Sequence, residues 1–308
     1  MTGQVLALCG PTASGKTAIS LELADCLDLE IVVCDSMQVY RGLDVGTAKP
    51  SVREQAGVPH HCLDLVDPSC EFCAVDYKRV ARAAIDDIHR RAKTPLLVGG
   101  VGLYLRAALD DLVFSSPPDP VRRKQLEACS PVELVRVLQE TDPVRAARVD
   151  LANPRRVLRA VEQALDGLPS ALDQAWLERS SLYPLALAVV APSEREELRT
   201  RVDARVDAMM AAGWLEEVQH LAATFPVFSR TARGAIGYAE LQQVLEGQLP
   251  LDSAIDRTKA RTRKYARRQL GWFRGEPRAV WFRGQPEELT APVQKFFQEA
   301  LHSSEQLL

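Results

Sequence analysis

Eight consecutive residues near the start of the chain have the types and the order that bind phosphate groups. Gly10–Thr17 follow the pattern G-x-x-x-x-G-K-[ST], with an apolar run, Gln4–Cys9, directly before them and a helical pattern, Thr17–Leu27, directly after. In this strand–loop–helix context, backbone N–H groups and the positive end of a helix dipole bind phosphate oxygens. We therefore predict that a diphosphate or nucleotide binds to Gly10, Pro11, Thr12, Ala13, Ser14, Gly15, Lys16 and Thr17.

Two side chains of this loop add charge and metal chemistry. Lys16 places a positive charge beside the phosphates, and the hydroxyl of Thr17 can bind Mg²⁺. We predict that Lys16 is catalytic and that Thr17 is a metal ligand. The loop predicts a bound diphosphate or triphosphate, but it does not specify a reaction.

Asp35 is the acid best placed to act beside the phosphate loop. It follows a second apolar run, Glu30–Cys34, and open parallel sheets bind their ligands at the carboxyl ends of their strands. A third run, Pro95–Val98, ends in Gly99–Gly102 without an acid. Asp35 therefore fits a magnesium ligand or a general base, with a carboxylate that only caps a turn as the structural alternative. Gly42–Pro50, with two glycines, a hydroxyl and a lysine, is a weaker indication of a second anion-binding segment.

These chemical groups need a parallel sheet to position them. Short apolar runs alternate with helical patterns such as Asp76–Arg91, and this alternation predicts parallel strands with helices on both faces. The predicted fold class is α/β, with a P-loop NTPase-like parallel sheet flanked by helices and a helical insertion domain.

The insertion is predicted from a change of pattern in the middle of the chain. Residues 115–120 read SSPPDP, a linker signal. Residues 121–179 show helical patterns only, and prolines mark their starts or breaks at Pro131, Pro143, Pro154 and Pro169. A strand pattern returns at Tyr183–Val190. We therefore predict three segments: a first part of the core at 1–115, the insertion at 116–179 and a second part of the core at 180–308.

The second part of the core carries a concentration of positive charge. It is predicted to hold two long helices, Arg195–Ala222 and Ile255–Phe273, and a frayed tail after Gln298. Asp256 is the only acid in 256–274, whereas the basic residues there are Arg257, Lys259, Arg261, Arg263, Lys264, Arg267, Arg268 and Arg274. Smaller basic clusters in the insertion are Arg122, Arg123 and Lys124, and Arg155, Arg156 and Arg159. These residues fit either a bound RNA backbone or solvated helix faces with ion pairs.

Composition favours a cytoplasmic, globular protein. The 308 residues are 46% hydrophobic and 26% charged, with a net charge of −3, and the chain begins without a signal-peptide pattern or a membrane span. The seven cysteines include a Cys70-x-x-Cys73 spacing, but no second pair of zinc ligands accompanies it, so we predict reduced thiols. No heptad repeat or exposed apolar stripe requires a second subunit, so we expect a monomer.

Further motifs resemble those of the isopentenyl-tRNA transferase family, also called the tRNA dimethylallyltransferase family. Besides the phosphate loop, the segments that carry this resemblance are DSMQVYRG (35–42), GTAKP (46–50), VPHH (58–61), GGVGLY (99–104), NPRR (153–156), AIGY (235–238), YARRQ (265–269) and WFR (272–274). Each segment is short, but together they span nearly the whole chain in the expected order.

The resemblance implies a prenyltransferase that acts on tRNA. The phosphate loop would bind the diphosphate of dimethylallyl diphosphate with Mg²⁺, rather than hydrolyse ATP, and Asp35 would be the general base. The acceptor would be N6 of adenine 37, next to the anticodon, in tRNAs that read codons beginning with U. The insertion would bind the anticodon stem-loop. The implied tRNA-binding residues are Asp35, Ser36, Met37, Gln38, Val101, Arg123, Arg155, Arg156, Val157, Leu158 and Arg159.

The chain departs from the family's usual motifs at three positions. Val101 stands where threonine is usual, Ala239 where a basic residue is common, and Gly271 where threonine commonly precedes Trp272. Val101 lacks a hydroxyl that could contact the diphosphate or the tRNA. An arginine would support the departing diphosphate, and we predict Arg233 for this catalytic role, with Arg230 as a second candidate.

Two other functions share part of the pattern. A P-loop kinase of a small metabolite would have the same loop and sheet, but the chain has no obvious adenine-lid segment, and such a kinase does not need a long basic helix. A nucleotide-gated RNA-binding protein without enzymatic activity would not need an acid at Asp35 beside the loop.

Overall fold

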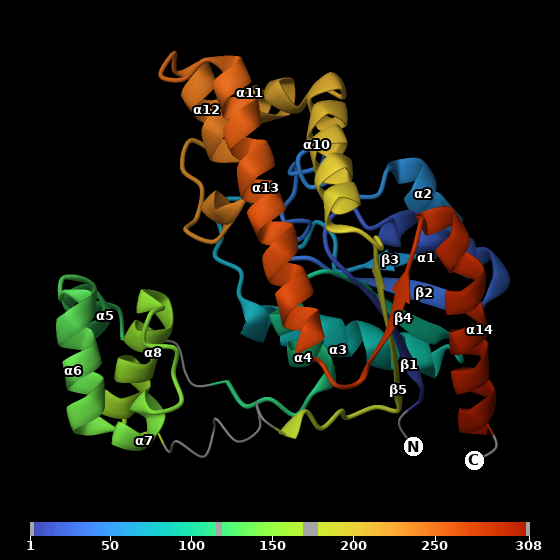
Figure 1. The fold of residues 1–308 in the computed structure, drawn as a ribbon, viewed down its shortest axis with the longest axis horizontal. Helices are drawn as coiled ribbons and strands as arrows, with labels where there is room; N and C mark the ends of the chain where they lie inside the picture. Colours follow the sequence, from blue (N-terminus) through green and yellow to red (C-terminus); the bar gives the residue numbers. More distant parts are fainter. Residues whose placement is uncertain (1–2, 115–118, 169–177, 306–308) are drawn as a thin grey trace. The chain divides into compact units, whose positions relative to one another are not determined.

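The computed structural model describes residues 3–114, 119–168 and 178–305, which form two compact units (Figure 1). The core unit contains described residues of 1–109 and 181–308, and the helical unit contains those of 110–180. Residues 115–118 of the predicted linker, and Pro169, lie outside the described residues.

A six-stranded parallel sheet is the centre of the core unit, in the order β3-β2-β4-β1-β5-β6. Its strands are β1 (Val5–Cys9), β2 (Leu29–Cys34), β3 (His60–His61), β4 (Thr94–Gly99), β5 (Leu185–Ala191) and β6 (Ala279–Arg283). The predicted fold class is confirmed. The short strand β3 and the strand β6, which form the two edges, were not predicted from the sequence.

Helices cover both faces of this sheet. The helices of the core unit are α1 (Lys16–Cys26), α2 (Val52–Gly57), α3 (Ala74–Arg90), α4 (Gly102–Leu109), α10 (Arg195–Ala211), α11 (Trp214–Thr224), α12 (Tyr238–Leu245), α13 (Leu251–Arg274) and α14 (Pro286–Glu305), with a short 3₁₀ helix, η2 (Ala232–Gly234). Leu6 and Leu8 of β1 pack in one core with side chains of α1 and α14. Val5 and Ala7 pack in a second core with side chains of α3 and α4. Because the strands are buried on both sides, they appear in the sequence as continuous apolar runs.

The predicted long helix Arg195–Ala222 is wrong, because the structure divides it in two. Gly213 has a left-handed backbone (φ 91°) and separates α10 from α11. Glycine adopts this conformation without the steric cost that a Cβ would add, so it commonly ends a helix. The apolar pattern continues across the break, which is why the two helices resemble one in the sequence.

The tail after Gln298, predicted to be frayed, is helical as far as Glu305. Val293 and Phe297 of α14 are fully buried in the core that α1 and the sheet share. This packing holds the helix in place, and helical stability in proteins comes mostly from such tertiary contacts.

A buried carboxylate of β2 accepts a hydrogen bond from the edge strand β3. Glu30 of β2 accepts hydrogen bonds from Nε2 of His61 (2.7 Å) and from the guanidinium of Arg91 (2.8 Å). The hydrogen bond from Arg91, followed by that from His61, lowers the pKa of Glu30 from its ordinary value of 4.5 to about 2. A carboxyl whose pKa is depressed by folding adds stability above its unfolded pKa and loses it as the pH falls toward its folded pKa.

We therefore expect Glu30→Gln to lower the free energy of unfolding by about 2 kcal/mol at pH 7. Arg91 is partly exposed, so the loss is smaller than for a fully buried pair. The difference between parent and variant should shrink between pH 4.5 and pH 2. Urea unfolding at pH 7 and at a pH between 4.5 and 2 measures it, and an equal difference at both would contradict the assignment.

The helical unit has a core of its own. It consists of α5 (Pro120–Glu127), α6 (Pro131–Thr141), α7 (Pro143–Ala146) and α8 (Pro154–Leu165). Its helices begin at prolines, as predicted at Pro131, Pro143 and Pro154, because proline lacks the N–H that a first turn leaves unbonded. In the described part of the whole chain, no helix has the length and apolar character needed to cross a membrane.

Candidate active site

The phosphate loop connects β1 to α1 at the carboxyl edge of the sheet. A Cβ on Gly10 would lie 2.2 Å from the carbonyl oxygen of Val190, so only glycine fits this close approach of two strands. Gly15 precedes α1 and supplies no capping side chain. The N–H groups of the first helical turn therefore have no side-chain cap, and such groups bind anions.

Lys16 lies folded over this loop. Its Nζ donates a hydrogen bond to the carbonyl of Pro11 (2.6 Å) and lies 3.5 Å from Oγ of Ser14. Burial, followed by the positive charge of Arg205, lowers the pKa of Lys16 to about 8, and the charge of Asp35 partly opposes this shift. Lys16, Arg205 and Asp35 therefore lie within electrostatic range of one another.

Arg205 of α10 was not predicted as a functional residue. Burial lowers the pKa of its guanidinium, and Asp35 raises it. Its buried Nε has no hydrogen-bond partner among the described residues. A buried cation with an unsatisfied donor favours a bound anion. The sequence alone could have indicated a buried role for Arg205. This residue stands in the apolar stripe that Leu198, Val202 and Met209 form on one helix.

One carboxylate oxygen of Asp35 caps a turn, as in the structural alternative, and the other oxygen is free. Its Oδ1 accepts hydrogen bonds from the N–H groups of Met37 (2.8 Å) and Gln38 (3.3 Å). No hydrogen bond to Oδ2 comes from the described part of the chain. The cap therefore fixes the carboxylate in one orientation and leaves one oxygen able to accept a proton.

The strand register places Asp35 on the same edge as the phosphate loop. Cys34 pairs with Gly99, and Gly99 pairs with Cys9, so the three strands end in one row. Asp35 comes directly after β2, and Gly10 comes directly after β1. Because β4 lies between these strands, the two residues are about 10 Å apart, or two strand spacings. The predicted tRNA contacts Ser36 and Met37 continue from Asp35 and are partly exposed.

Helix α13 closes the site from one side. Gln269 is buried and accepts a hydrogen bond from the N–H of Thr12 (2.9 Å), while its Nε2 donates to the carbonyl of Gly100 (3.0 Å). A Cβ on Gly100 would lie 2.1 Å from that Nε2 and 2.9 Å from the backbone carbonyl oxygen of Gly10, so a larger residue there would displace Gln269. Tyr265, one turn earlier, has a pKa raised first by burial and next by Asp35, which places it near that carboxylate. Val101 is partly buried and packs against the core that Val5 and Ala7 share with α3 and α4.

The segment 42–50 does not bind anions through its lysine. Lys49 is buried and donates hydrogen bonds to the carboxylates of Asp44 (2.5 Å) and Asp64 (2.5 Å). Its charge is neutralised within the protein, so the suggested second anion-binding segment is wrong in this respect. The amide of Gln38 donates to two carbonyls of the same segment, at 3.1 and 3.2 Å. The segment therefore supports the turn that follows Asp35.

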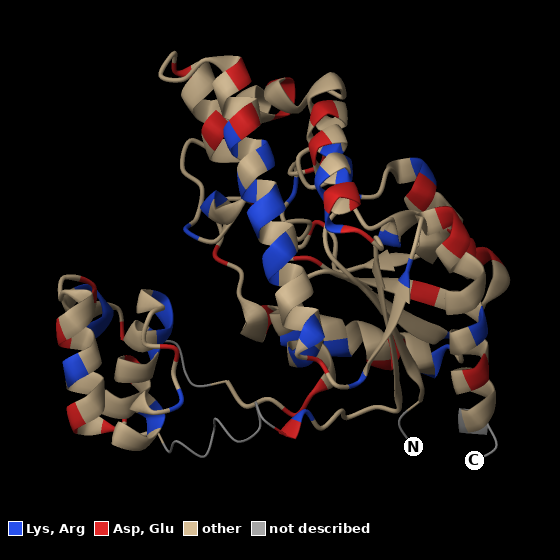
Figure 2. Cartoon of the chain, in the orientation of Figure 1, with Lys and Arg blue, Asp and Glu red and all other residues tan. Residues whose placement is uncertain are grey.

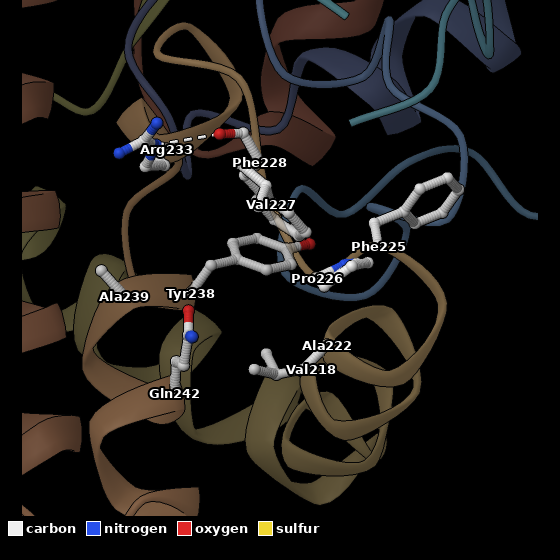
Figure 3. A pocket seen from close by; sticks show the side chains of 10 residues that line it. All are labelled: Val218, Ala222, Phe225, Pro226, Val227, Phe228, Arg233, Tyr238, Ala239 and Gln242. Atoms are coloured by element: carbon white, nitrogen blue, oxygen red, sulfur yellow. Dashed lines mark hydrogen bonds between the residues drawn. The ribbon is translucent and has the colours of Figure 1, made fainter. Parts of the chain in front are cut away.

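Arg233 lines a separate pocket instead of the phosphate loop (Figure 3). Its Nε donates to the carbonyl of Phe228 (2.9 Å), and among the described residues its hydrogen bonds do not reach the loop. The pocket has a volume of about 340 Å³ and is lined by Val218, Ala222, Phe225, Pro226, Val227, Phe228, Arg233, Tyr238, Ala239 and Gln242. Arg205 is therefore better placed than Arg233 for the role of supporting a departing diphosphate.

The helical unit presents its predicted RNA-binding residues unevenly. Arg155 and Arg156 are exposed on α8. Arg123 and Arg159 are half-buried and both lie against the buried carboxylate of Glu162, at 3.5 and 3.1 Å. Val157 and Leu158 are buried in the core of the unit. Their side chains form the apolar stripe of α8, and their contact with RNA stays a prediction.

Basic residues occur along α13 (Figure 2), and they divide into two groups by their ion pairs. Lys259 and Arg263 form ion pairs with acids of α10, and Arg261 pairs with Glu240 of α12. The other basic residues are exposed and have no ion pair with another described residue: Arg257, Lys264, Arg267, Arg268 and Arg274. The predicted basic stripe is therefore partly neutralised, and its free charges lie mostly in the half of α13 that contains Gln269.

Comparisons with known proteins find relatives that match most of the chain. The model of the IPP transferase family matches residues 38–276. A tRNA dimethylallyltransferase of Paenarthrobacter aurescens is 43% identical over 300 residues, 96% of each chain. Another, of Anaeromyxobacter dehalogenans, is 47% identical over 278 residues, 89% of this chain and 92% of the relative.

Solved structures show the same likeness. A tRNA isopentenylpyrophosphate transferase of Bacillus halodurans has 35% identity and a TM-score of 0.75 over 100% of this chain and 99% of its own. A eukaryotic dimethylallyltransferase, solved acting on tRNA, has 27% identity and a TM-score of 0.79 over 92% of this chain and 74% of its own. The chain therefore belongs to the IPP transferase family, the family of the tRNA dimethylallyltransferases.

Proposed function

We propose that this chain transfers the dimethylallyl group of dimethylallyl diphosphate to N6 of adenine 37, next to the anticodon, in tRNAs that read codons beginning with U. The products are N6-isopentenyladenosine and diphosphate. The observation that carries the proposal is the strand register that brings the phosphate loop with Lys16 and the carboxylate of Asp35 to one edge of the sheet. Arg205, whose buried Nε has no hydrogen-bond partner among the described residues, adds a second cation. Two cations suit a departing diphosphate, and one carboxylate suits an incoming amine.

The transfer forms one bond and breaks another. The N6 amine attacks the primary allylic carbon, the carbon–oxygen bond to the diphosphate breaks, and its electron pair leaves with the diphosphate. Negative charge then grows on the leaving oxygen. Lys16, Arg205 and the N–H groups of the phosphate loop are fixed before the reaction, so they stabilise this charge without reorganising.

Asp35 removes the proton that the reaction releases. The N6 nitrogen becomes cationic as the new bond forms, and its proton passes to Oδ2 of Asp35. Oδ1 is held by two backbone N–H groups, which keeps Oδ2 in one position. General-base catalysis of this kind contributes ~10²–10⁴-fold to a rate.

Mg²⁺ is the metal that suits this site. The Thr17 hydroxyl makes no hydrogen bond to another described residue, so it is available as a ligand. No three His, Cys, Asp or Glu side chains gather as a metal site within the described residues. This fits Mg²⁺, which takes many of its ligands from phosphates and water. When bound, it would neutralise charge on the diphosphate, with Thr17 holding it.

The RNA would be held by phosphate contacts. The unpaired basic residues of α13, and Arg155 and Arg156 of the helical unit, are suited to the backbone of an anticodon stem-loop. The adenine must leave its stack to reach a closed site. We further propose that the enzyme acts as a monomer in the cytoplasm.

A transfer assay tests this function. The protein is incubated with unmodified tRNA, Mg²⁺ and labelled dimethylallyl diphosphate, and in parallel with ATP and small metabolites. We expect label in the RNA and an equal amount of released diphosphate, without consumption of ATP. Consumption of ATP without labelled RNA would instead indicate the kinase, which the relatives of this chain do not favour.

A further inference from the structure

Gln269 joins two loops of the active site to one helix. Its Oε1 accepts the N–H of Thr12 in the phosphate loop, and its Nε2 donates to Gly100 in the loop after β4. A glutamine that satisfies one buried donor and one buried acceptor fixes both loops, because leaving either partner unbonded costs about 1–3 kcal/mol. A small displacement of α13 therefore displaces the phosphate loop.

The opposite face of the same helical turn is exposed and basic. Arg267 and Arg268 directly precede Gln269 and have no ion pair with another described residue, and the guanidinium of Arg268 lies 5.7 Å from the ring centroid of Tyr265. Ala13 of the phosphate loop packs in a small apolar cluster with Ala266 and Leu270 of α13. One turn of α13 thus presents cations to solvent and holds the phosphate loop on its inner side.

We propose that Gln269 is a positioning residue that couples RNA bound on the outer face of α13 to the phosphate loop. This inference rests on the proposed function. RNA phosphates on Arg267 and Arg268 restrain the helix, and the restrained helix holds Gln269. Gln269 then keeps the loop in the conformation that receives a diphosphate. Coupling between two binding sites is reciprocal, so a bound diphosphate also tightens the binding of RNA.

The test compares the affinity for Mg²⁺–pyrophosphate with and without a saturating anticodon stem-loop RNA. In the parent protein, we expect the RNA to tighten pyrophosphate binding about tenfold, within the usual range of such coupling. In Gln269→Met, which keeps the shape but removes both hydrogen bonds, the tightening should fall below about twofold. The affinity for RNA alone should stay unchanged, because the basic face is intact.

Arg257→Ala is the matched control, because Arg257 is an exposed cation of α13 that lies far along the helix from the turn of Gln269. It should weaken RNA binding but leave the tightening intact once the RNA is saturating. A purely structural role of Gln269 would lower pyrophosphate affinity equally with and without RNA, and that result would overturn the inference. So would an unchanged tightening in Gln269→Met, or no tightening in the parent protein.

A second variant and a transfer assay separate a failure of the coupling from a failure of folding or of the proposed function. If Gln269→Met does not fold, as judged from its thermal unfolding, Gln269→Glu replaces it. That variant keeps the acceptor for Thr12 but loses the donor to Gly100, so the tightening should decrease, and an unchanged value would overturn the inference. Label transfer by the parent is measured in the same preparation. Its absence contradicts the proposed function, whereas transfer with tightening that does not depend on Gln269 contradicts only the coupling.

Discussion

Asp35→Asn is expected to lower the rate of dimethylallyl transfer by ~10²–10⁴-fold, the usual contribution of a general base. Asparagine keeps an Oδ1 that can accept the N–H groups of Met37 and Gln38, so the turn should persist. It cannot accept the proton of the amine. Single-turnover rates with saturating tRNA measure the effect on the chemical step, and the affinity for tRNA should remain nearly the same.

Asp76→Asn is the control for this prediction. Asp76 also accepts a backbone N–H, that of Cys73 at 2.9 Å, but it does so at the exposed start of α3. Its replacement should leave the rate unchanged. If Asp35→Asn retained the parent rate within a few-fold, Asp35 would be a turn cap only, and another group would have to remove the proton.

Lys16→Ala is expected to lower kcat/KM for dimethylallyl diphosphate by ~10²–10³-fold, comparable to the loss of one preorganised donor at a developing negative charge. The charge of Lys16 also predicts a pH dependence. The pKa of Lys16 lies at about 8, below its ordinary value of 10.5. The cation that attracts diphosphate is therefore present below pH 8 and is lost as the pH rises through it.

Binding of Mg²⁺–pyrophosphate across this pH range measures the effect. Affinity in the parent should decrease as the pH rises through about 8, and this decrease should be absent in Lys16→Ala. Lys93→Ala, which removes a surface lysine paired with Asp28 at 3.0 Å, should behave like the parent. Equal pyrophosphate affinity in Lys16→Ala and in the parent would show that the loop does not bind diphosphate through this lysine.

The parts of the site that depend on local sequence were predictable. The phosphate loop is a contiguous motif, and Asp35 follows an apolar strand, so both positions could be inferred from their neighbours in the chain. The parallel sheet follows from the same alternation of strands and helices. Structure added the orientation of Asp35, whose Oδ1 caps a turn while Oδ2 stays free.

The residues that depend on tertiary packing were not predictable in the same way. Arg205 lies 170 residues after Asp35 and reaches the site only because α10 packs beside the phosphate loop. Lys49 resembles an anion ligand in the sequence, but its two carboxylate partners become apparent only in the fold. The strand β6 was missed although Ala279–Phe282 are consecutive apolar residues, so its sequence signal was overlooked.

The burial of two of the predicted RNA-binding residues could be inferred from periodicity alone. Val157 and Leu158 belong to a motif segment that resembles an RNA-binding element, yet with Val161 they follow the apolar spacing of α8. A helix of this kind faces its core with such residues and solvent with Arg155 and Arg156. Membership of a motif should therefore be weighed against the face on which each residue lies.

The most direct test of the mechanism is a crosslinking experiment with an anticodon stem-loop RNA that carries a photoreactive adenine analogue at position 37. The RNA is bound to the protein with Mg²⁺ and pyrophosphate, irradiated, and the attached peptide is sequenced. We predict attachment within Asp35–Gln38, beside the phosphate loop. Attachment to the pocket around Tyr238 and Arg233 instead would contradict the arrangement in which the diphosphate and the adenine meet between Lys16 and Asp35.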